Sequence, residues 1–319
     1  MTDQRGASAG DYRAPLFLAW QLTNSCQGRC LHCCEESGPD RAWPKELSRD
    51  EALTLARNIV KLGIPYVVFG GGEPLGVPHF WEICEILHGG EVAVKIETDG
   101  RLLDDAAIAR LKAWRVSCVQ ISVDGASAEV HERLRPGGSF AGALTAILKL
   151  GAAGLGPELV FIPTKLNVDE APAVYDLALN SGARTFITGP LMRLGRAAAD
   201  WERLAVDDGD WRRIVAALEE KARRCGNKVR LAVYPWDIRE EIRTRHERPQ
   251  AMMLVVPDGK AKLLNALPFA PGDLRRQSLA EAWEAVQRGW KSPKVSEFVG
   301  RVLAEPGLLR HANECWEAA

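Results

Sequence analysis

Short apolar runs alternate along the chain with longer segments whose apolar positions follow helical spacing. Runs rich in valine, isoleucine and phenylalanine predict six strands, at residues 16–22, 66–69, 92–97, 118–123, 159–163 and 184–188. Segments of helical period lie between them, at residues 47–62, 79–87, 104–113, 140–151 and 171–180. Parallel strands need long crossover connections, which are usually helices, so this alternation predicts a parallel β-sheet.

The predicted strands are apolar along their whole length rather than alternating, which is typical of a sheet covered by helices. Six strand–helix repeats are too few for a closed eight-stranded barrel. We therefore expect an α/β fold built as a partial (β/α)6 TIM-like barrel. A doubly wound open sheet is the alternative.

The rhythm changes after Gly195, and the last third of the chain predicts a different arrangement. Its predicted elements are a charged helix, a strand, a charged helix face, a hairpin and two helices, at residues 211–224, 229–234, 237–248, 252–264, 279–289 and 293–303. We place a boundary near residue 200. This gives a flexible N-terminal arm (1–14), a barrel domain (15–200) and a smaller C-terminal α/β appendage (201–319).

Composition narrows the classes of function. The chain has 319 residues, and 41 Lys and Arg stand against 42 Asp and Glu, for a net charge of −1. No overall positive field therefore draws it to nucleic acid or to an anionic membrane. No apolar run reaches the length of a membrane span, and the first residues lack the apolar block of a secretory signal. We expect a cytoplasmic protein with neither nucleic acid nor a membrane as its partner.

The eight cysteines are unevenly placed, because Cys26, Cys30, Cys33 and Cys34 fall within nine residues. A disulfide framework is not expected in a cytosolic chain of this size. Three thiolates spaced as C-x3-C-x2-C in a tight loop can converge on one metal centre. An iron–sulfur cluster ordinarily has four cysteine ligands, so three would leave one iron open to bind a substrate.

Two alternatives to a cluster stay open at this point. A structural zinc site usually needs four closed ligands with paired C-x2-C spacing, and no second pair is present in the sequence. The cysteines can also be purely structural. Cys34 is an alternative fourth ligand, although adjacent cysteines seldom point the same way.

Glycines and polar residues follow every predicted strand. Ligands of α/β barrels bind at the carboxyl ends of the strands, so these segments are expected to meet at one rim. The segments are residues 24–26, 70–74, 97–100, 122–125, 164–167 and 189–193. Turn formation explains the glycines one by one, but not why polar residues gather at one rim.

Two of these segments carry recognisable motifs: Cys26-x3-Cys30-x2-Cys33, with His32 in a slot that is usually aromatic, and Gly-Gly-Glu-Pro at 71–74. At these residues the chain resembles the radical S-adenosylmethionine (SAM) superfamily, over roughly residues 15–195. The resemblance implies one 4Fe–4S cluster held by the three cysteines, with SAM on the open iron. It also implies that one electron cleaves SAM to a 5′-deoxyadenosyl radical, which abstracts a hydrogen atom from a substrate.

The same resemblance implies a set of cofactor-binding residues: Gly71, Gly72, Glu73, Ser122, Asp124, Arg135, Asn167 and Arg193. The glycines and Glu73 would meet the methionine ammonium, since only glycine lets the backbone pass so close to a ligand. Ser122 and Asp124 would face the ribose and the methionine carboxylate, and Arg135 would pair with that carboxylate. A solvated helix-end arginine is the alternative for Arg135, and ordinary polar strand ends are the alternative for the last two. Glu97 and Asp99 are interpreted as solvated.

More narrowly, the chain resembles the SPASM/twitch-related branch that includes the maturases of pyrroloquinoline quinone and mycofactocin. The hairpin around Pro257-Asp258-Gly259 is similar to the carboxyl-terminal region of that branch, where cysteines bind auxiliary clusters. Here Asn265 stands where such a cysteine is expected, and only Cys225 and Cys315 remain. Two isolated cysteines cannot close a cluster. We therefore expect a single cluster and a degenerate appendage that closes the barrel mouth.

The resemblance implies an oxidoreductase or maturase that acts on a peptide or a cofactor and takes electrons from a donor such as flavodoxin or ferredoxin. The cofactor of a tungsten-containing oxidoreductase is one candidate product. The alternatives are a radical SAM enzyme of small molecules, such as a sugar or a tetrapyrrole, and a non-catalytic iron–sulfur scaffold. No catalytic side chain is assigned at this stage.

Overall fold

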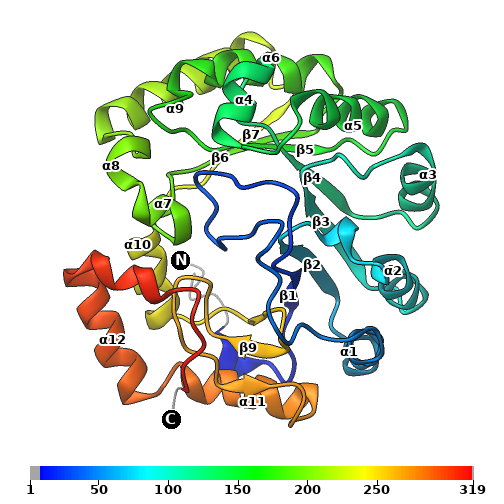
Figure 1. Ribbon diagram of the computed structural model, residues 1–319, viewed down its shortest axis with the longest axis vertical. Helices are drawn as coiled ribbons and strands as arrows, with labels where there is room; N and C mark the ends of the chain where they lie inside the picture. Colours follow the sequence, from blue (N-terminus) through cyan, green and yellow to red (C-terminus); the bar gives the residue numbers. More distant parts are fainter. Residues whose placement is uncertain (1–7, 318–319) are drawn as a thin grey trace, which may run out of the picture.

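The computed structural model describes residues 8–317, and this part of the chain forms a ten-stranded sheet with helices around it (Figure 1). The strand order is β10-β9-β8-β1-β2-β3-β4-β5-β6-β7. The strands are β1 (Phe17–Thr23), β2 (Tyr66–Gly71), β3 (Ala93–Thr98), β4 (Cys118–Ser122), β5 (Glu158–Phe161), β6 (Thr185–Thr188), β7 (Arg230–Val233), β8 (Met252–Val255), β9 (Lys260–Lys262) and β10 (Gly272–Asp273).

Most of this sheet is parallel. All pairings from β8 through β1 to β7 are parallel, whereas β9 and β10 run antiparallel at one edge. In Figure 1 the strands form a curved wall with helices outside it, and the segment between β1 and α1 lies in the hollow. The sheet ends at β7 and β10, which do not pair with each other in the described residues. The predicted partial barrel is confirmed.

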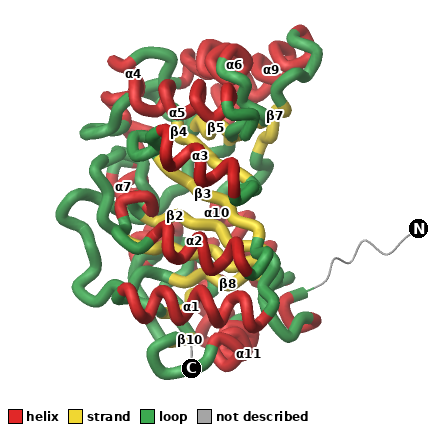
Figure 2. Tube along the Cα trace, turned by 90° about the vertical axis from the view of Figure 1, so that its right-hand side faces the viewer, coloured by secondary structure: helices red, strands yellow, loops and turns green. Residues whose placement is uncertain are grey.

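The helices follow the predicted alternation, and Figure 2 shows α1, α2, α3 and α5 stacked along one side of the sheet. They are α1 (Arg49–Leu62), α2 (Phe80–Gly89), α3 (Asp105–Ala113), α4 (Ala128–Leu134), α5 (Phe140–Ala152), α6 (Ala171–Asn180), α7 (Gly195–Ala199), α8 (Trp201–Leu204), α9 (Asp208–Arg224), α10 (Ile238–Glu247), α11 (Leu279–Gly289) and α12 (Pro293–Ala304). A capping box begins α1, in which Ser48 and Glu51 are bonded reciprocally. The short helices α4, α7 and α8 were not predicted.

The last third of the chain does not stand apart from the sheet. β7 pairs with β6 and β8 pairs with β1, so both contribute parallel strands beyond the predicted six. The sheet therefore crosses the boundary expected near residue 200, and the division into a barrel domain and an appendage stays a prediction. The sequence did not predict this continuation of the sheet, because β8 pairs with β1 across more than two hundred residues and no local pattern specifies such a pairing.

The strands are not apolar throughout, which corrects the expectation from the sequence. In β3, Val94 and Ile96 are buried, whereas Lys95 and Glu97 lie on the opposite face. Successive side chains of a strand point to opposite faces, and helices cover only the outer face of this sheet. The inner face therefore carries polar residues that open into the hollow of the barrel.

The described part of the predicted N-terminal arm (residues 1–14) is held against the rest of the molecule. Residues 1–7 lie outside the described part, but Ala9 is 2% exposed and its N–H donates to the carbonyl oxygen of Pro249. Gln287 of α11 donates to the carbonyl oxygens of Ala9 and Tyr12 at 2.7 and 3.0 Å. These bonds hold the chain against α11 from Ala9 onward.

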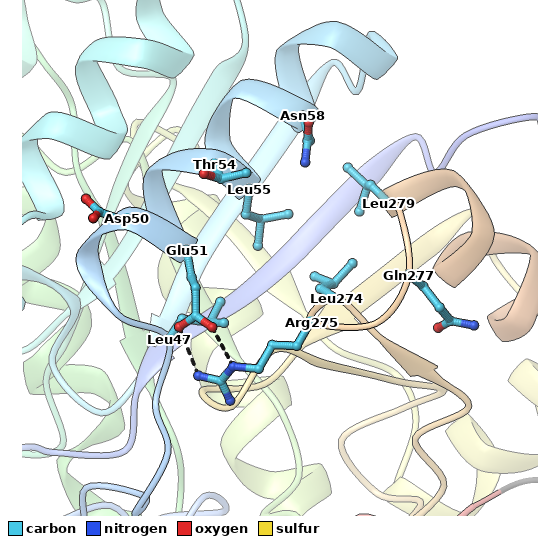
Figure 3. A pocket seen from close by; sticks show the side chains of 10 residues that line it. All are labelled: Leu47, Asp50, Glu51, Thr54, Leu55, Asn58, Leu274, Arg275, Gln277 and Leu279. Carbon is cyan, nitrogen blue, oxygen red and sulfur yellow. Dashed lines mark hydrogen bonds and ion pairs between the residues drawn. The ribbon is translucent and has the colours of Figure 1, made fainter.

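A bidentate ion pair joins the C-terminal third of the chain to α1 on the outer surface (Figure 3). Arg275 donates to both carboxylate oxygens of Glu51, at 2.7 and 3.0 Å. The pair borders a pocket of about 380 Å³ whose apolar lining includes Leu47, Leu55 and Leu274. None of the three motif cysteines lines this pocket.

Within residues 8–317 no helix combines the length and the apolar character that crossing a bilayer requires.

Candidate cofactor site

The hollow of the barrel holds a pocket of about 180 Å³ between the cluster loop (residues 24–38) and the strand ends. Cys26, Cys30 and Cys33 all line it. The strand ends contribute the glycines and Glu73 after β2, Glu97 and Asp99 at the end of β3, and Gln120 and Ser122 of β4. The two motifs, about forty residues apart in sequence, therefore face one pocket. Cys34 does not line it.

Hydrogen bonds with two other segments fix the cluster loop. The N–H groups of Arg29 and Leu31 donate to the carbonyl oxygens of Pro136 and Leu134, at 2.7 and 2.8 Å. Arg196 of α7 binds the other side: its N–H donates to Cys33 O at 3.1 Å and its Nε to Cys30 O at 2.7 Å. The thiols are thus held on a loop whose backbone is bonded at both of these cysteines.

The glycines after β2 are required by close packing against the same loop. A Cβ on Gly72 would lie 2.0 Å from the carbonyl oxygen of Ser25, next to Cys26. Gly71 has a φ of 100°, and a Cβ there would lie 2.7 Å from Thr23 O. The Gly72 N–H donates to Thr23 O at 2.7 Å. These glycines therefore let two strand ends approach, in addition to any contact with a ligand.

Glu73 is a buried carboxylate at the pocket wall, 2% exposed. Its oxygens accept hydrogen bonds from Thr98 Oγ1 at 2.8 Å, from Leu75 N at 3.1 Å and from Asp99 N at 3.1 Å. Burial raises the pKa of Glu73 to about 7, and the nearby Asp99 carboxylate adds to the rise, while these hydrogen bonds oppose it. A positively charged ligand group beside Glu73 would favour its ionised form.

Asp124 lies behind the pocket wall and not in it. Its side chain is fully buried and accepts from Arg135 Nε at 2.5 Å and from Ile162 N at 3.0 Å, and it lies 3.1 Å from His32 Nε2. Burial is the largest single influence on the pKa of Asp124 and raises it. The charges of Arg135 and His32 and the hydrogen bonds together outweigh burial, and they hold this pKa well below its usual range. Asp124 is therefore placed to orient Arg135 and His32.

Arg135 places its positively charged guanidinium at the pocket. It lines the pocket, its side chain is 13% exposed, and its Nη1 lies 3.6 Å from Cys30 Sγ. This placement excludes the alternative of a solvated arginine at a helix end. His32 Nδ1 is buried and has no hydrogen-bond partner within residues 8–317. A buried nitrogen without a partner is costly and fits a site that binds a further group.

Three other predicted residues lie in different settings. Ser122 lines the pocket as expected. Asn167 is 2% exposed, and its amide is used in bonds to Thr164 N, Asp124 O and Ile162 O, so it shapes the loop after β5. Arg193 lies over the ring of Trp201, 5.3 Å from its centroid, and does not line the pocket.

The residues present fit a 4Fe–4S cluster and SAM. Three thiols share the pocket with a buried carboxylate, a guanidinium and a glycine cradle that one Cβ would fill. Burial is the main reason that the pKa of Cys26 rises to about 11, and it also raises the pKa of Cys30. Such thiols ionise on binding a metal. Within residues 8–317 no three His, Cys, Asp or Glu side chains are grouped for a single metal ion.

Comparison with known proteins agrees with these motifs. The family model for the radical SAM superfamily matches residues 20–178, which include the cluster loop and the strands β2 to β5. The chain belongs to the radical SAM superfamily. The cofactors of this superfamily, a 4Fe–4S cluster and SAM, are those that the sequence resemblance implied.

Relatives of this radical SAM protein include maturases and enzymes of small molecules. The mycofactocin maturase MftC of Mycobacterium ulcerans is 38% identical over 192 residues, which are 60% of this chain and 51% of the relative. The AdoMet-dependent heme synthase of Methanosarcina barkeri is 27% identical in an alignment of 323 positions that covers 95% of this chain and 90% of the relative. The chain spans about half the length of the first curated relatives it matches.

A solved structure supports the fold of the radical SAM protein. Streptococcus suis SuiB bound to S-adenosylmethionine superposes with a TM-score of 0.71 over 85% of this chain and 66% of SuiB, at 12% identity. Identity at this level supports the shared fold alone.

Several residues at the pocket were missed or misread from the sequence. Arg196 and His131 line it, and neither belongs to a recognisable motif. Asp99 is not a freely solvated residue, because Arg101 donates to it at 2.6 and 2.8 Å and its side chain is 18% exposed. Glu97 faces the pocket. The alternation of polar and apolar residues at 93–98 was the available signal for Glu97.

Proposed function

We propose that this chain is a radical SAM enzyme that cleaves SAM reductively at a single 4Fe–4S cluster and removes a hydrogen atom from a substrate during peptide or cofactor maturation. Cys26, Cys30 and Cys33 would hold the cluster, which would supply the electron for that cleavage. The observation that carries the proposal is that the three thiols line one pocket with Gly72, Glu73 and Arg135.

Different residues of the chain would bind different groups of SAM. Glu73 presents a carboxylate that suits an ammonium group, and Arg135 presents a guanidinium that suits a carboxylate in two-point contact. Asp124 fixes Arg135 from behind, and Ser122 offers a hydroxyl to the ribose. Asn167 would contribute by shaping the loop after β5, whereas Arg193 would need to turn away from Trp201 to reach the pocket.

The relatives favour a peptide as the substrate over a small molecule. The mycofactocin maturase MftC of M. ulcerans is 38% identical to this chain over 192 residues. A tetrapyrrole or another small molecule is the second candidate, because the heme synthase of M. barkeri aligns over 95% of this chain. A non-catalytic iron–sulfur scaffold is disfavoured by the buried and paired Glu73, Asp124 and Arg135, which a binding loop alone would not need.

The proposal includes the setting of the reaction. All eight cysteines are free thiols, as expected in the reducing cytoplasm. An electron donor such as flavodoxin or ferredoxin would reduce the cluster. With Asn265 at the position where the branch has a ligand, and with only Cys225 and Cys315 left in the last third, we expect one cluster, or about four irons per chain.

The test is an anaerobic assay. Purified protein is reconstituted with iron and sulfide, reduced, and supplied with SAM, and 5′-deoxyadenosine is measured by liquid chromatography and mass spectrometry. We expect its formation by the wild type and by the control Cys225→Ala, and its loss in Cys30→Ala. Equal formation by Cys30→Ala would reject the role of the cluster loop.

A further inference from the structure

A row of polar side chains crosses the inner face of the sheet directly below the cluster loop. Gln21 of β1 is opposite Gly70 of β2, and Glu97 of β3 is opposite Gln120 of β4. Gln120 is in turn opposite Glu158 of β5. Glu97 and Gln120 line the same pocket as the three cysteines. Their side chains therefore border the site proposed for the cluster and SAM, and none of the roles proposed above uses them.

The missing side chain at Gly70 makes room for the Glu97 carboxylate. A Cβ on Gly70 would lie 3.2 Å from Glu97 Oε2. The Glu97 side chain is 43% exposed, whereas Lys95 and Glu158 on the same face are each 17% exposed. The Glu97 carboxylate therefore opens into the pocket, and the other two charged groups are enclosed below it.

Within residues 8–317, Glu97 has no closely bonded cation of its own on this face. The Lys95 ammonium donates to Glu158 Oε2 at 3.2 Å, and it lies 3.8 Å from Glu97 Oε1, beyond hydrogen-bonding distance. Arg184, the other cation near Glu158, is 3.9 Å from Glu158 Oε1. Asp99 does not draw on these cations, because it is paired with Arg101. One enclosed ammonium thus serves two carboxylates, and Glu97 is the carboxylate without a hydrogen-bond donor among the described residues.

The electrostatic environment of Glu97 points the same way. Burial is the main cause that raises the pKa of Glu97, and the carboxylates of Glu158 and Glu35 add to the rise, while Lys95 lowers it. A further cation beside the Glu97 carboxylate would favour its ionised form. The amide of Gln120 makes no hydrogen bond within residues 8–317 and offers an additional polar contact at the same level of the barrel.

We propose that Glu97, assisted by Gln120, binds a cationic group of the substrate, a primary ammonium or a guanidinium, and so positions the substrate beneath the cofactors. This inference rests on the proposed function and adds a substrate class to it: a peptide or small molecule with a positively charged side chain. Glu97 is the residue that sets this specificity, since its carboxylate is the anionic group that opens into the pocket without a donor of its own.

The test compares two probes of equal length. N-acetyl-lysine methylamide carries an ammonium, and the methylamide of N-acetyl-2-aminoheptanoic acid carries a methyl group in its place. Dissociation constants are measured by calorimetry on protein with its cluster and SAM bound and without reductant, so that no turnover occurs. A hydrogen bond to a charged group corresponds to about a ten-fold preference for the lysine probe. Glu97→Gln is expected to abolish the preference, and the exposed control Glu85→Gln of α2 to keep it.

Equal binding of the two probes by the wild type, or a preference that survives in Glu97→Gln, would overturn the inference. If Glu97→Gln does not incorporate the cluster, Glu97→Asp keeps the charge but withdraws it by one methylene. We then expect the preference to fall several-fold, and an undiminished preference would reject the role of Glu97. A SAM-induced change in the spectrum of the reduced cluster is recorded on separate, reduced portions of the same preparations, before and after SAM is added. Its absence would contradict the proposed function, whereas its presence without a lysine preference would contradict this inference alone.

Discussion

Arg135 donates from Nε to the fully buried carboxylate of Asp124 at 2.5 Å. The guanidinium is thereby fixed with its Nη1 lying 3.6 Å from the sulfur of Cys30. A buried carboxylate thus holds a cation beside the loop that carries the thiols. The pair joins the segment after β4 to the C-cap of α4, and its two residues lie eleven positions apart in the sequence.

We predict that Asp124→Asn is strongly destabilising. The substitution leaves Arg135 charged, enclosed and without its anion, and breaking a buried ion pair from one side costs about 3–5 kcal/mol. Urea denaturation measures the free energy of unfolding. The double variant with Arg135→Met is expected to lose less than the sum of the single variants, because it removes both charges. Additive losses would show that the two residues are not coupled.

Gly72→Ala is predicted to prevent cluster binding although every cysteine is retained. Its Cβ would lie 2.0 Å from Ser25 O, a backbone atom that moves only with the loop carrying Cys26. Iron content after anaerobic reconstitution is the measurement. Gly89→Ala is the control, because nothing lies within 4 Å of a Cβ at the end of α2. Normal iron content in Gly72→Ala would mean that the loop can move without losing the site.

Glu73→Gln is predicted to weaken SAM binding about ten-fold, since a charged hydrogen bond is replaced by a neutral one. The affinity of the wild type should also fall as the pH drops below about 7, because Glu73, whose pKa is raised to about 7 by burial and by Asp99, then takes up a proton. Glu73→Gln should show no such step. Titration of SAM against the spectrum of the cluster at pH 6 and pH 8 measures both effects, and an identical pH response of the two proteins would count against Glu73.

His131 is predicted to make stability depend on pH. Burial is the main cause that lowers the pKa of His131 to about 4, and Arg135 adds to it, whereas an unfolded histidine titrates near 6.5. The unfolded chain therefore binds more protons between these values, so stability is full above about pH 6.5 and falls as the pH decreases towards 4. Between pH 7 and pH 5 the wild type should lose about 2 kcal/mol more than His131→Asn in urea denaturation. Parallel losses would contradict this assignment.

Local features of the fold could be predicted from the sequence because they depend on neighbouring residues. Ser48 and Glu51 define the start of α1, and Gly259, with a φ of 84°, forms the turn of the β8–β9 hairpin. The parallel sheet followed from the alternation of strands and helices. The pairing of β8 with β1 could not be predicted, because it depends on contacts across most of the chain.

The site shows the same division. The motifs predicted that Cys26, Cys30, Cys33 and Glu73 would meet, because each follows a strand of a parallel sheet. Arg196 could not be predicted, since its role is to bind the backbone of the cluster loop from a helix about 165 residues away in sequence. Sequence alone also could not show that the polar atoms of Asn167 are occupied by the loop after β5.

The central claim is that three thiolates hold a cluster whose remaining iron binds SAM. The most direct measurement is electron paramagnetic resonance of the reconstituted and reduced protein before and after SAM is added, with iron counted on the same sample. We predict about four irons per chain and a signal that changes on adding SAM. A protein that binds no iron, or a signal that SAM leaves unchanged, would contradict the account.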